Sequence, residues 1–156
     1  MINNDILRSI RYMLDLSDNK VVEIIHLANP DFVIGRDDVH AFLLREDMPD
    51  YLACSDDALA HLLDGLIIHR RGRDESLPSR PVEKRINNNV VLKKLRVAFE
   101  LKDVDMHQVF EDAGFPVSKP ELSALFRQPG HSNFRPCGDQ MLRNFLKGLT
   151  LRVRGA

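Results

Sequence analysis

The sequence predicts an all-α protein made by tandem duplication of a four-helix unit of about 70 residues. Three observations lead to this fold class. The second half of the chain repeats the first, the apolar residues recur at helical spacing, and alternating strand patterns are scarce. The 156 residues are 44% hydrophobic and 29% charged, which is typical of a globular protein with a packed core.

The duplication is visible as matched residues at a nearly constant offset. The segment 3–11 matches 88–96 at an offset of 85 residues. Later matches, at an offset of 83, include both cysteines, an aspartate and a glycine: Cys54 with Cys137, Asp56 with Asp139 and Gly65 with Gly148. We assign residues 1–72 to the first helical repeat, 73–85 to a polar, proline-containing linker, and 86–156 to the second repeat.

The two copies are expected to pack on each other. A unit of about 70 residues buries only about 60% of its surface alone and is marginally stable. Pseudo-two-fold symmetry is the simplest arrangement for two such copies.

Four helices are expected in the first repeat. Their signals are, in order, an N-cap at Asn4, an N-cap at Ser17 or Asp18, an apolar face of Val39, Phe42 and Leu43, and an N-cap at Ser55. Asn29-Pro30 ends the second helix, because proline cannot continue it.

The second repeat follows the same order with clearer end signals. Ala113-Gly114 predicts the end of its second helix, because glycine adopts the left-handed cap without steric cost. The segment 118–121, Ser-Lys-Pro-Glu, is a capping box that opens the third helix. Only residues 149–154 alternate in polarity, which is compatible with a frayed helix end or a short strand.

The duplicated pattern resembles the YehS-like family of uncharacterised bacterial proteins, in which the domain of unknown function 1456 is duplicated. The motifs that carry the resemblance are the opening Asn3-Asn4-Asp5-Ile6-Leu7-Arg8 and its counterpart at 88–93. The resemblance extends over essentially the full length. It implies a small cytoplasmic protein with two copies of one helical domain, and it supplies no catalytic residues.

Composition points to the cytoplasm. No apolar run reaches the roughly 18 residues that a membrane span needs. The N-terminal residues lack the basic-then-apolar order of a secretory signal. Two cysteines cannot form a disulfide framework, which suits a reducing compartment.

Motifs for catalysis, cofactors or metals are lacking, so we expect no enzyme activity, no cofactor and no metal. None of the six histidines recurs at the matched position of the other repeat, and none lies in a ligand cluster. Asp37-Asp38 and Asp56-Asp57 fall in expected first turns, where carboxylates complement the helix dipole.

Cys54 and Cys137 are the candidate pair for thiol chemistry. Both precede the fourth helix of their repeat, and a helix N-terminus lowers the pKa of a nearby thiol. The alternatives are a redox or nucleophilic pair, a disulfide across the pseudo-two-fold axis, or two small apolar residues packed beneath a turn. The absence of a CxxC or Cys–His arrangement favours the last.

The two repeats carry opposite charge. Residues 1–72 hold 7 basic and 13 acidic side chains, a net of −6, while 86–156 hold 11 and 7, a net of +4. The copies could therefore pair within a chain or between chains as a homo-oligomer. The basic repeat, with a helix-turn-helix-like segment at 106–127, could instead bind nucleic acid.

Basic positions in the first helix are our candidates for partner binding. The repeated polar patch consists of Asn4, Arg8 and Arg11 and their matches Asn89, Lys93 and Arg96. The pairs Arg11–Asp15 and Arg96–Glu100 could also be simple i,i+4 ion pairs. We expect a binding or regulatory module that contacts a macromolecule, protein before nucleic acid and not a membrane, through these repeated helix faces.

Overall fold

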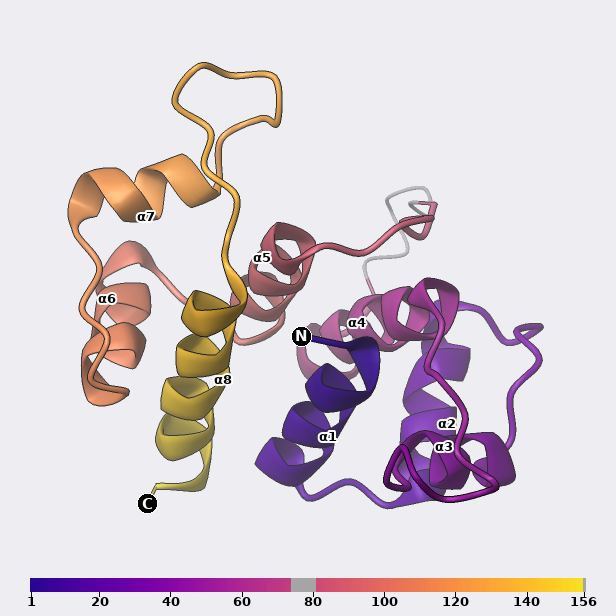
Figure 1. The fold of residues 1–156 in the computed structure, drawn as a ribbon. Coiled ribbons are helices and arrows are strands. Elements are labelled where there is room, and N and C mark those ends of the chain that lie inside the picture. The colour runs from indigo at the N-terminus through magenta and orange to yellow at the C-terminus, as the bar shows by residue number, and fades with distance from the viewer. Residues whose placement is uncertain (74–80, 156) are drawn as a thin grey trace. The chain divides into compact units, whose positions relative to one another are not determined.

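The computed structural model describes residues 1–73 and 81–155, and these ranges contain eight helices and no strand. In chain order the helices are α1 (Asn3–Leu14), α2 (Asp18–Ala28), α3 (Arg36–Phe42), α4 (Asp56–Arg71), α5 (Asn88–Ala98), α6 (Asp103–Asp112), α7 (Lys119–Leu125) and α8 (Asp139–Arg154). Figure 1 shows them along the chain. The expected all-α class, with a duplicated four-helix order, is confirmed.

The chain divides into two compact units, Met1–Ile86 and Asn87–Ala156, with four helices in each. Residues 74–80 of the expected linker lie outside the described residues. The pseudo-two-fold packing of the copies stays a prediction.

A glycine lets two helices meet closely in each unit. In the first unit α2 packs on α4, and a Cβ on Gly65 would overlap the carbonyl oxygen of Ile24. In the second unit α6 packs on α8, and a Cβ on Gly148 would overlap the carbonyl oxygen of Val109. The glycine matched between the repeats is therefore the point where two helix backbones touch.

Each unit has its own apolar core. Apolar residues with at most 2% exposure include, in the first unit, Ile6, Ile10, Ile24, Leu59, Leu63 and Leu66, and in the second, Leu92, Val109, Phe110, Leu142, Phe145 and Leu149. The rings of Phe110 and Phe145 lie 5.5 Å apart between centroids, at an interplanar angle of 49°. Burial of these faces supplies the main drive for folding.

Most expected helix ends are confirmed. The hydroxyls of Ser17, Ser55 and Ser118 each accept a hydrogen bond from a backbone N–H of the first turn. Gly114 follows α6 with φ 75°, in the left-handed region that glycine favours.

One expectation about a helix end is wrong, and one of two open alternatives is excluded. Asn4 is not an N-cap: α1 is capped by Ile2, so Asn4 lies inside the first turn and its side chain turns inward. The strand alternative for residues 149–154 also fails, because α8 continues to Arg154 and the N–H of Gly155 donates to the carbonyl oxygen of Leu151.

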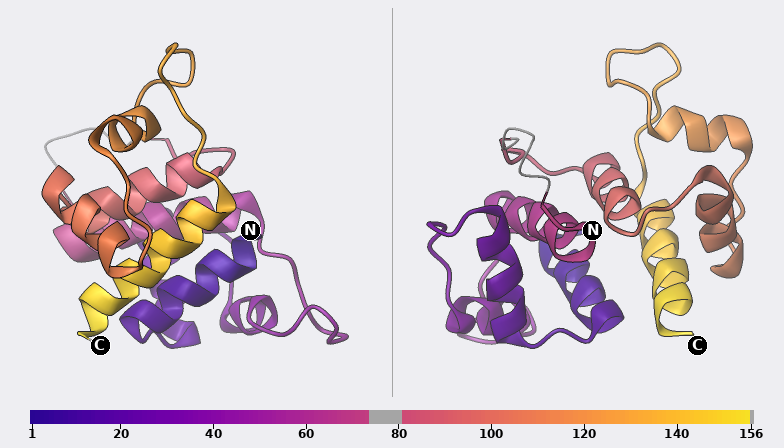
Figure 2. Two further views of the ribbon diagram at one scale, coloured as in Figure 1. Left: turned by 60° about the vertical axis from the view of Figure 1, so that its left-hand side comes forward. Right: turned by 180° about the vertical axis from the view of Figure 1, so that it is seen from behind.

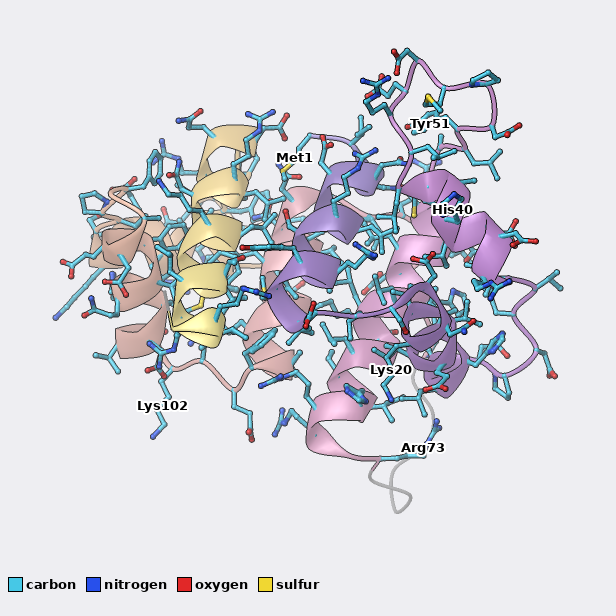
Figure 3. The ribbon with its side chains drawn as sticks, turned by 90° about the horizontal axis from the view of Figure 1, so that it is seen from below. Met1, Lys20, His40, Tyr51, Arg73 and Lys102 are labelled. Carbon is cyan, nitrogen blue, oxygen red and sulfur yellow. The ribbon has the colours of Figure 1, made fainter. Side chains whose placement is uncertain are left out.

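The connection between the third and fourth helices is a long loop in both units. We call residues 43–53 the first loop and residues 126–136 the second loop. The second loop stands clear of the helices of its own unit in two views (Figure 2). Tyr51 marks the first loop, which extends beyond α3 (Figure 3).

No helix among the described residues has the length and apolar character needed to cross a membrane.

Candidate functional site

A buried asparagine closes the base of the first loop. The Nδ2 group of Asn4 donates to the carbonyl oxygens of Phe42 at 2.9 Å and Leu52 at 2.8 Å. Its Oδ1 accepts from the backbone N–H of Cys54 at 3.0 Å. Asn4 is 1% exposed, so these bonds form away from water and join α1 to both ends of the loop.

Asn89 makes the same three bonds in the second unit. Its Nδ2 donates to the carbonyl oxygens of Leu125 and Arg135, both at 3.0 Å, and its Oδ1 accepts from the N–H of Cys137 at 2.8 Å. We call Asn4 and Asn89, with these partners, the asparagine clamps. The duplication reproduces them bond for bond.

The preceding asparagine braces the start of the fourth helix. The Nδ2 group of Asn3 donates to the carbonyl oxygen of Cys54 at 3.1 Å and to the carboxylate of Asp56 at 2.7 Å. The matching bonds, at 2.9 Å and 2.8 Å, join Asn88 to Cys137 and Asp139. The hydrogen bond from Asn3, followed by one from the backbone N–H of Ile86, holds the pKa of Asp56 below its usual value.

The two loops share three backbone hydrogen bonds. These form two successive turns within each loop and one bond from near the end of the loop back to the third helix. In the first loop the donor–acceptor pairs are Met48–Arg45, Tyr51–Met48 and Leu52–Ala41, and in the second they are His131–Gln128, Phe134–His131 and Arg135–Ala124. The loops are therefore one backbone conformation presented twice.

The side chains on this shared backbone differ completely. None of the eleven aligned positions in 43–53 and 126–136 holds the same residue. The first loop has one basic and three acidic residues, a net of −2, namely Arg45, Glu46, Asp47 and Asp50. The second has Arg127 and Arg135 and no acidic residue, a net of +2. These charged side chains belong to exposed residues.

Arg8 supports the first loop from α1. Its guanidinium donates to the carbonyl oxygen of Leu44 at 2.6 Å and to the carboxylate of Asp5 at 3.0 Å. The matched Lys93 is exposed, and lysine lacks the planar fork that allows two such bonds at once. Arg8 therefore helps to hold the base of the first loop, whereas within the described part of the chain no such bond to the second loop is seen for Lys93.

Arg11 and Arg96 are engaged within their own units. Arg11 lies 3.6 Å from the carboxylate of Asp18, and Arg96 lies 2.6 Å from that of Asp103. Arg96 also donates to the carbonyl oxygen of Leu101 and lies 4.7 Å from the ring centroid of Phe126. Both arginines join the first helix of their repeat to the second.

The expected i,i+4 partners of these arginines are wrong. Asp15 and Glu100 have φ angles of 55° and 53°, so the chain has left the helix at both positions. The spacing that brings i and i+4 side chains together holds only inside a helix. The acids that begin the second helix, Asp18 and Asp103, take their place.

The thiols do not have the low pKa that the redox or nucleophilic alternative requires. Burial raises the pKa of Cys54 to about 12 and that of Cys137 to about 11, with a further rise from Asp56 and Asp139 respectively. The cysteines precede the N-caps Ser55 and Gly138, and each Sγ lies within 3.7 Å of the carbonyl oxygen of that cap. Both thiols are free and buried, in agreement with the packed-residue alternative.

Three histidines hold loops to helices. His61 is buried, stacks on Phe32 with ring centroids 4.2 Å apart, and places Nδ1 2.7 Å from the carbonyl oxygen of Asp57. His26 contacts the carbonyl oxygen of Phe32 at 2.9 Å, and His107 contacts that of Val117 at 2.9 Å. Among the described residues, no group of three or more His, Cys, Asp or Glu is arranged to hold a metal ion.

The loops are the feature that sequence reasoning missed. Their signal is present in the alignment of the repeats: an unmatched stretch of equal length lies between the matched Ala41/Ala124 and Cys54/Cys137. Of the predicted binding residues, Asn4 is wholly internal and Asn89 is half-buried, and both serve the clamps.

The chain is similar to proteins of one family. A family model described as "Protein of unknown function (DUF1456)" matches residues 3–72 and, a second time, residues 88–155. The curated "Uncharacterized protein YehS" of Escherichia coli (strain K12) is 47% identical over 152 residues, which cover 97% of this chain and 96% of that protein. No solved structure matches the chain.

Proposed function

The chain belongs to the DUF1456 family, and we propose that it is a non-enzymatic binding or regulatory module whose two loops contact a macromolecular partner. One observation carries the proposal: the same clamp and the same loop backbone occur twice, with entirely different exposed side chains. Binding residues are commonly presented on loops that a rigid scaffold positions.

The clamps suit such a role because they reduce the cost of ordering the loops. An exposed loop that is ordered only on binding loses conformational entropy at that moment. Here Asn4 and Asn89 tie both ends of each loop to the helices in the free chain. Each loop is therefore presented in one backbone conformation.

We now prefer the two loops, rather than the repeated polar patch of the first helices, as the surface that contacts the partner. Arg8, Arg11 and Arg96 already bond to groups of their own unit, which makes them supports rather than free contacts. A protein partner is favoured over nucleic acid, because the first loop, with a net charge of −2, repels phosphate. Two free, buried thiols are compatible with a cytoplasmic location.

Affinity capture from a lysate with matched baits tests this proposal. In the loop bait, residues 45–50 and 128–133 are replaced by Gly-Ser sequences of equal length, which leaves the clamp partners in place. In the control bait, Arg11→Ala and Arg96→Ala remove the helix-face arginines. We expect the loop bait to lose the partners of the wild type and the control bait to keep them. The opposite pattern, with both baits folded by circular dichroism, would reject the loops in favour of the helix faces.

Nucleic-acid binding by the second repeat is the second candidate. Its support is the second loop, which carries Arg127 and Arg135 without an acidic residue, in a repeat of net charge +4. Binding of a random single-stranded RNA or a duplex DNA that falls steeply with salt, and falls further in Arg127→Ala, is the expected result for this candidate. Absence of binding even at low salt eliminates it.

A further inference from the structure

We propose that the first loop of one chain binds the second loop of another copy of the same chain. This inference rests on the proposed function, because it names the partner of the same loops.

The charges of the two loops are complementary. Glu46, Asp47 and Asp50 give the first loop a net of −2, and Arg127 and Arg135 give the second a net of +2. The side chain of Arg135 is 60% exposed, and its nearest carboxylate in the unit is that of Glu121 at 3.8 Å. Opposite charge of this kind steers two surfaces together and orients them.

Apolar groups accompany the acids of the first loop. Met48 is 40% exposed and Leu52 is 46% exposed, and both lie beside the carboxylates in sequence. The second loop offers Pro129, Phe134 and Pro136 between its arginines or next to them. A contact that buries apolar groups within a charged rim is typical of protein partners.

A second copy of the chain is a single partner that could bind both loops, since it carries a complementary loop for each. A polyanion such as RNA would explain the basic loop and leave the acidic loop without a role. A cationic partner would explain only the acidic loop. The equal and opposite charges arise on one shared backbone, at the same place in two copies of one unit.

The proposed contact joins two different surfaces of the chain, so it can produce either of two kinds of assembly. If both loops of one chain engage both loops of a second chain, the pair closes as a two-fold dimer. If each loop engages a different chain, the assembly grows as an open chain. Both outcomes are self-association through the same loop pair.

Sedimentation velocity of the purified full chain, over a range of concentrations at about 20 mM and about 500 mM NaCl, measures this association. The Debye length falls from about 20 Å to about 4 Å between these conditions, so exposed charge pairs are screened. We expect self-association at low salt and at least tenfold weaker association at high salt. A chain that stays monomeric at low salt up to the highest soluble concentration would overturn the proposal.

Charge exchange between the loops identifies the surfaces. The pair Glu46→Lys and Asp50→Lys changes the first loop from −2 to +2, and the pair Arg127→Glu and Arg135→Glu changes the second from +2 to −2. Each double variant alone has two loops of like charge and is expected to be monomeric. Mixing the two double variants, or combining all four changes in one chain, is expected to restore association.

A matched control separates loop charge from net charge. Asp31→Lys with Asp37→Lys makes the same change in net charge as the first-loop variant, at exposed residues outside both loops. This control is expected to associate like the wild type. Loss of association in the control, or persistence of wild-type association in both loop variants, would sink the proposal.

The experiments distinguish failure of the self-association proposal from failure of the proposed function, which is binding through the loops. If the wild-type chain is monomeric but captures other proteins through its loops, self-association is overturned. The proposed function is then retained. RNA binding through the second loop by a monomeric chain overturns it in favour of the nucleic-acid candidate.

Discussion

The Oδ1 atom of Asn4 accepts a hydrogen bond from the backbone N–H of Cys54 at 3.0 Å, across 50 residues of sequence. The matched bond between Asn89 and Cys137 is 2.8 Å. An asparagine and a cysteine that recur in both repeats are thus parts of one tertiary contact. That contact sets the base of each loop on which the proposed function depends.

Removal of a clamp amide is expected to destabilise its unit. Asn4→Ala leaves the carbonyl oxygens of Phe42 and Leu52 and the N–H of Cys54 without their partner, at a cost of about 3 kcal/mol. Urea denaturation followed by circular dichroism measures this loss. Asn19→Ala, at an exposed position in the first turn of α2, should stay within about 0.5 kcal/mol of the wild type. An equal effect of the two changes would contradict the clamp.

Substitution of the glycine at either helix crossing by a residue with a side chain is expected to destabilise the protein. Gly65→Ala and Gly148→Ala place a Cβ on a backbone carbonyl of the facing helix, which must move apart. We expect a loss of about 3 kcal/mol, although alanine has the better helix propensity by about 1 kcal/mol. Gly130→Ala, which has no atom within 4 Å of its Cβ, is the control and should unfold like the wild type. Thermal or guanidinium unfolding that shows Gly65→Ala to be stabilising would refute the close crossing.

The thiols are expected to resist alkylation in the folded chain. Their pKa values of about 12 and about 11 leave little thiolate at pH 8, and burial limits access. We expect iodoacetamide to label native Cys54 and Cys137 at least about 100-fold more slowly than the same residues in urea. Mass spectrometry of labelled peptides measures both rates. Fast native labelling of either residue would revive the thiol hypothesis.

The raised thiol pKa values also predict a loss of stability at alkaline pH. The unfolded thiols ionise near their ordinary pKa of 9.0, whereas the folded thiols remain protonated until about 11 to 12. Their contribution is therefore complete below pH 9 and declines as pH rises through this window. The free energy of unfolding of Cys54→Ala/Cys137→Ala should fall less steeply above pH 9 than that of the wild type. Parallel profiles would show that the thiols do not titrate differently on unfolding.

Asp56 is expected to contribute stability that disappears in acid. The hydrogen bonds from Asn3 and Ile86 lower its folded pKa below the ordinary 3.8, so its contribution is complete above that value. The contribution is lost as pH falls through the folded pKa. Asp56→Asn should be less stable than the wild type at pH 7 and should approach it at low pH. A difference between Asp56→Asn and the wild type that stays constant from pH 7 to low pH would contradict this prediction.

The fold was largely predictable because its signals are local. Serine caps at Ser17, Ser55 and Ser118, the stop at Gly114 and the spacing of apolar residues depend on neighbours within a few positions. The candidate site was harder to predict, because Asn4 also has the local features of an N-cap. Its inward direction follows from the loop that lies 38 to 50 residues away.

The difference between local and long-range signals also explains why the predicted ion-pair partners of Arg11 and Arg96 differ from the observed ones. The sequence spacing favoured Asp15 and Glu100 as partners of Arg11 and Arg96, whereas the turn after each first helix brings Asp18 and Asp103 to them. A turn of three residues in the first repeat and four in the second changes the direction of the chain, and helical spacing no longer applies beyond it.

From the sequence alone come the duplication, the all-α class, the order of helices and the opposite charges of the repeats, since composition and short-range periodicity encode them. Only the tertiary structure decided that the matched asparagines clamp two loops, that the matched glycines are helix crossings and that the matched cysteines are buried thiols. These roles depend on which distant segments meet, and packing of the whole unit determines that.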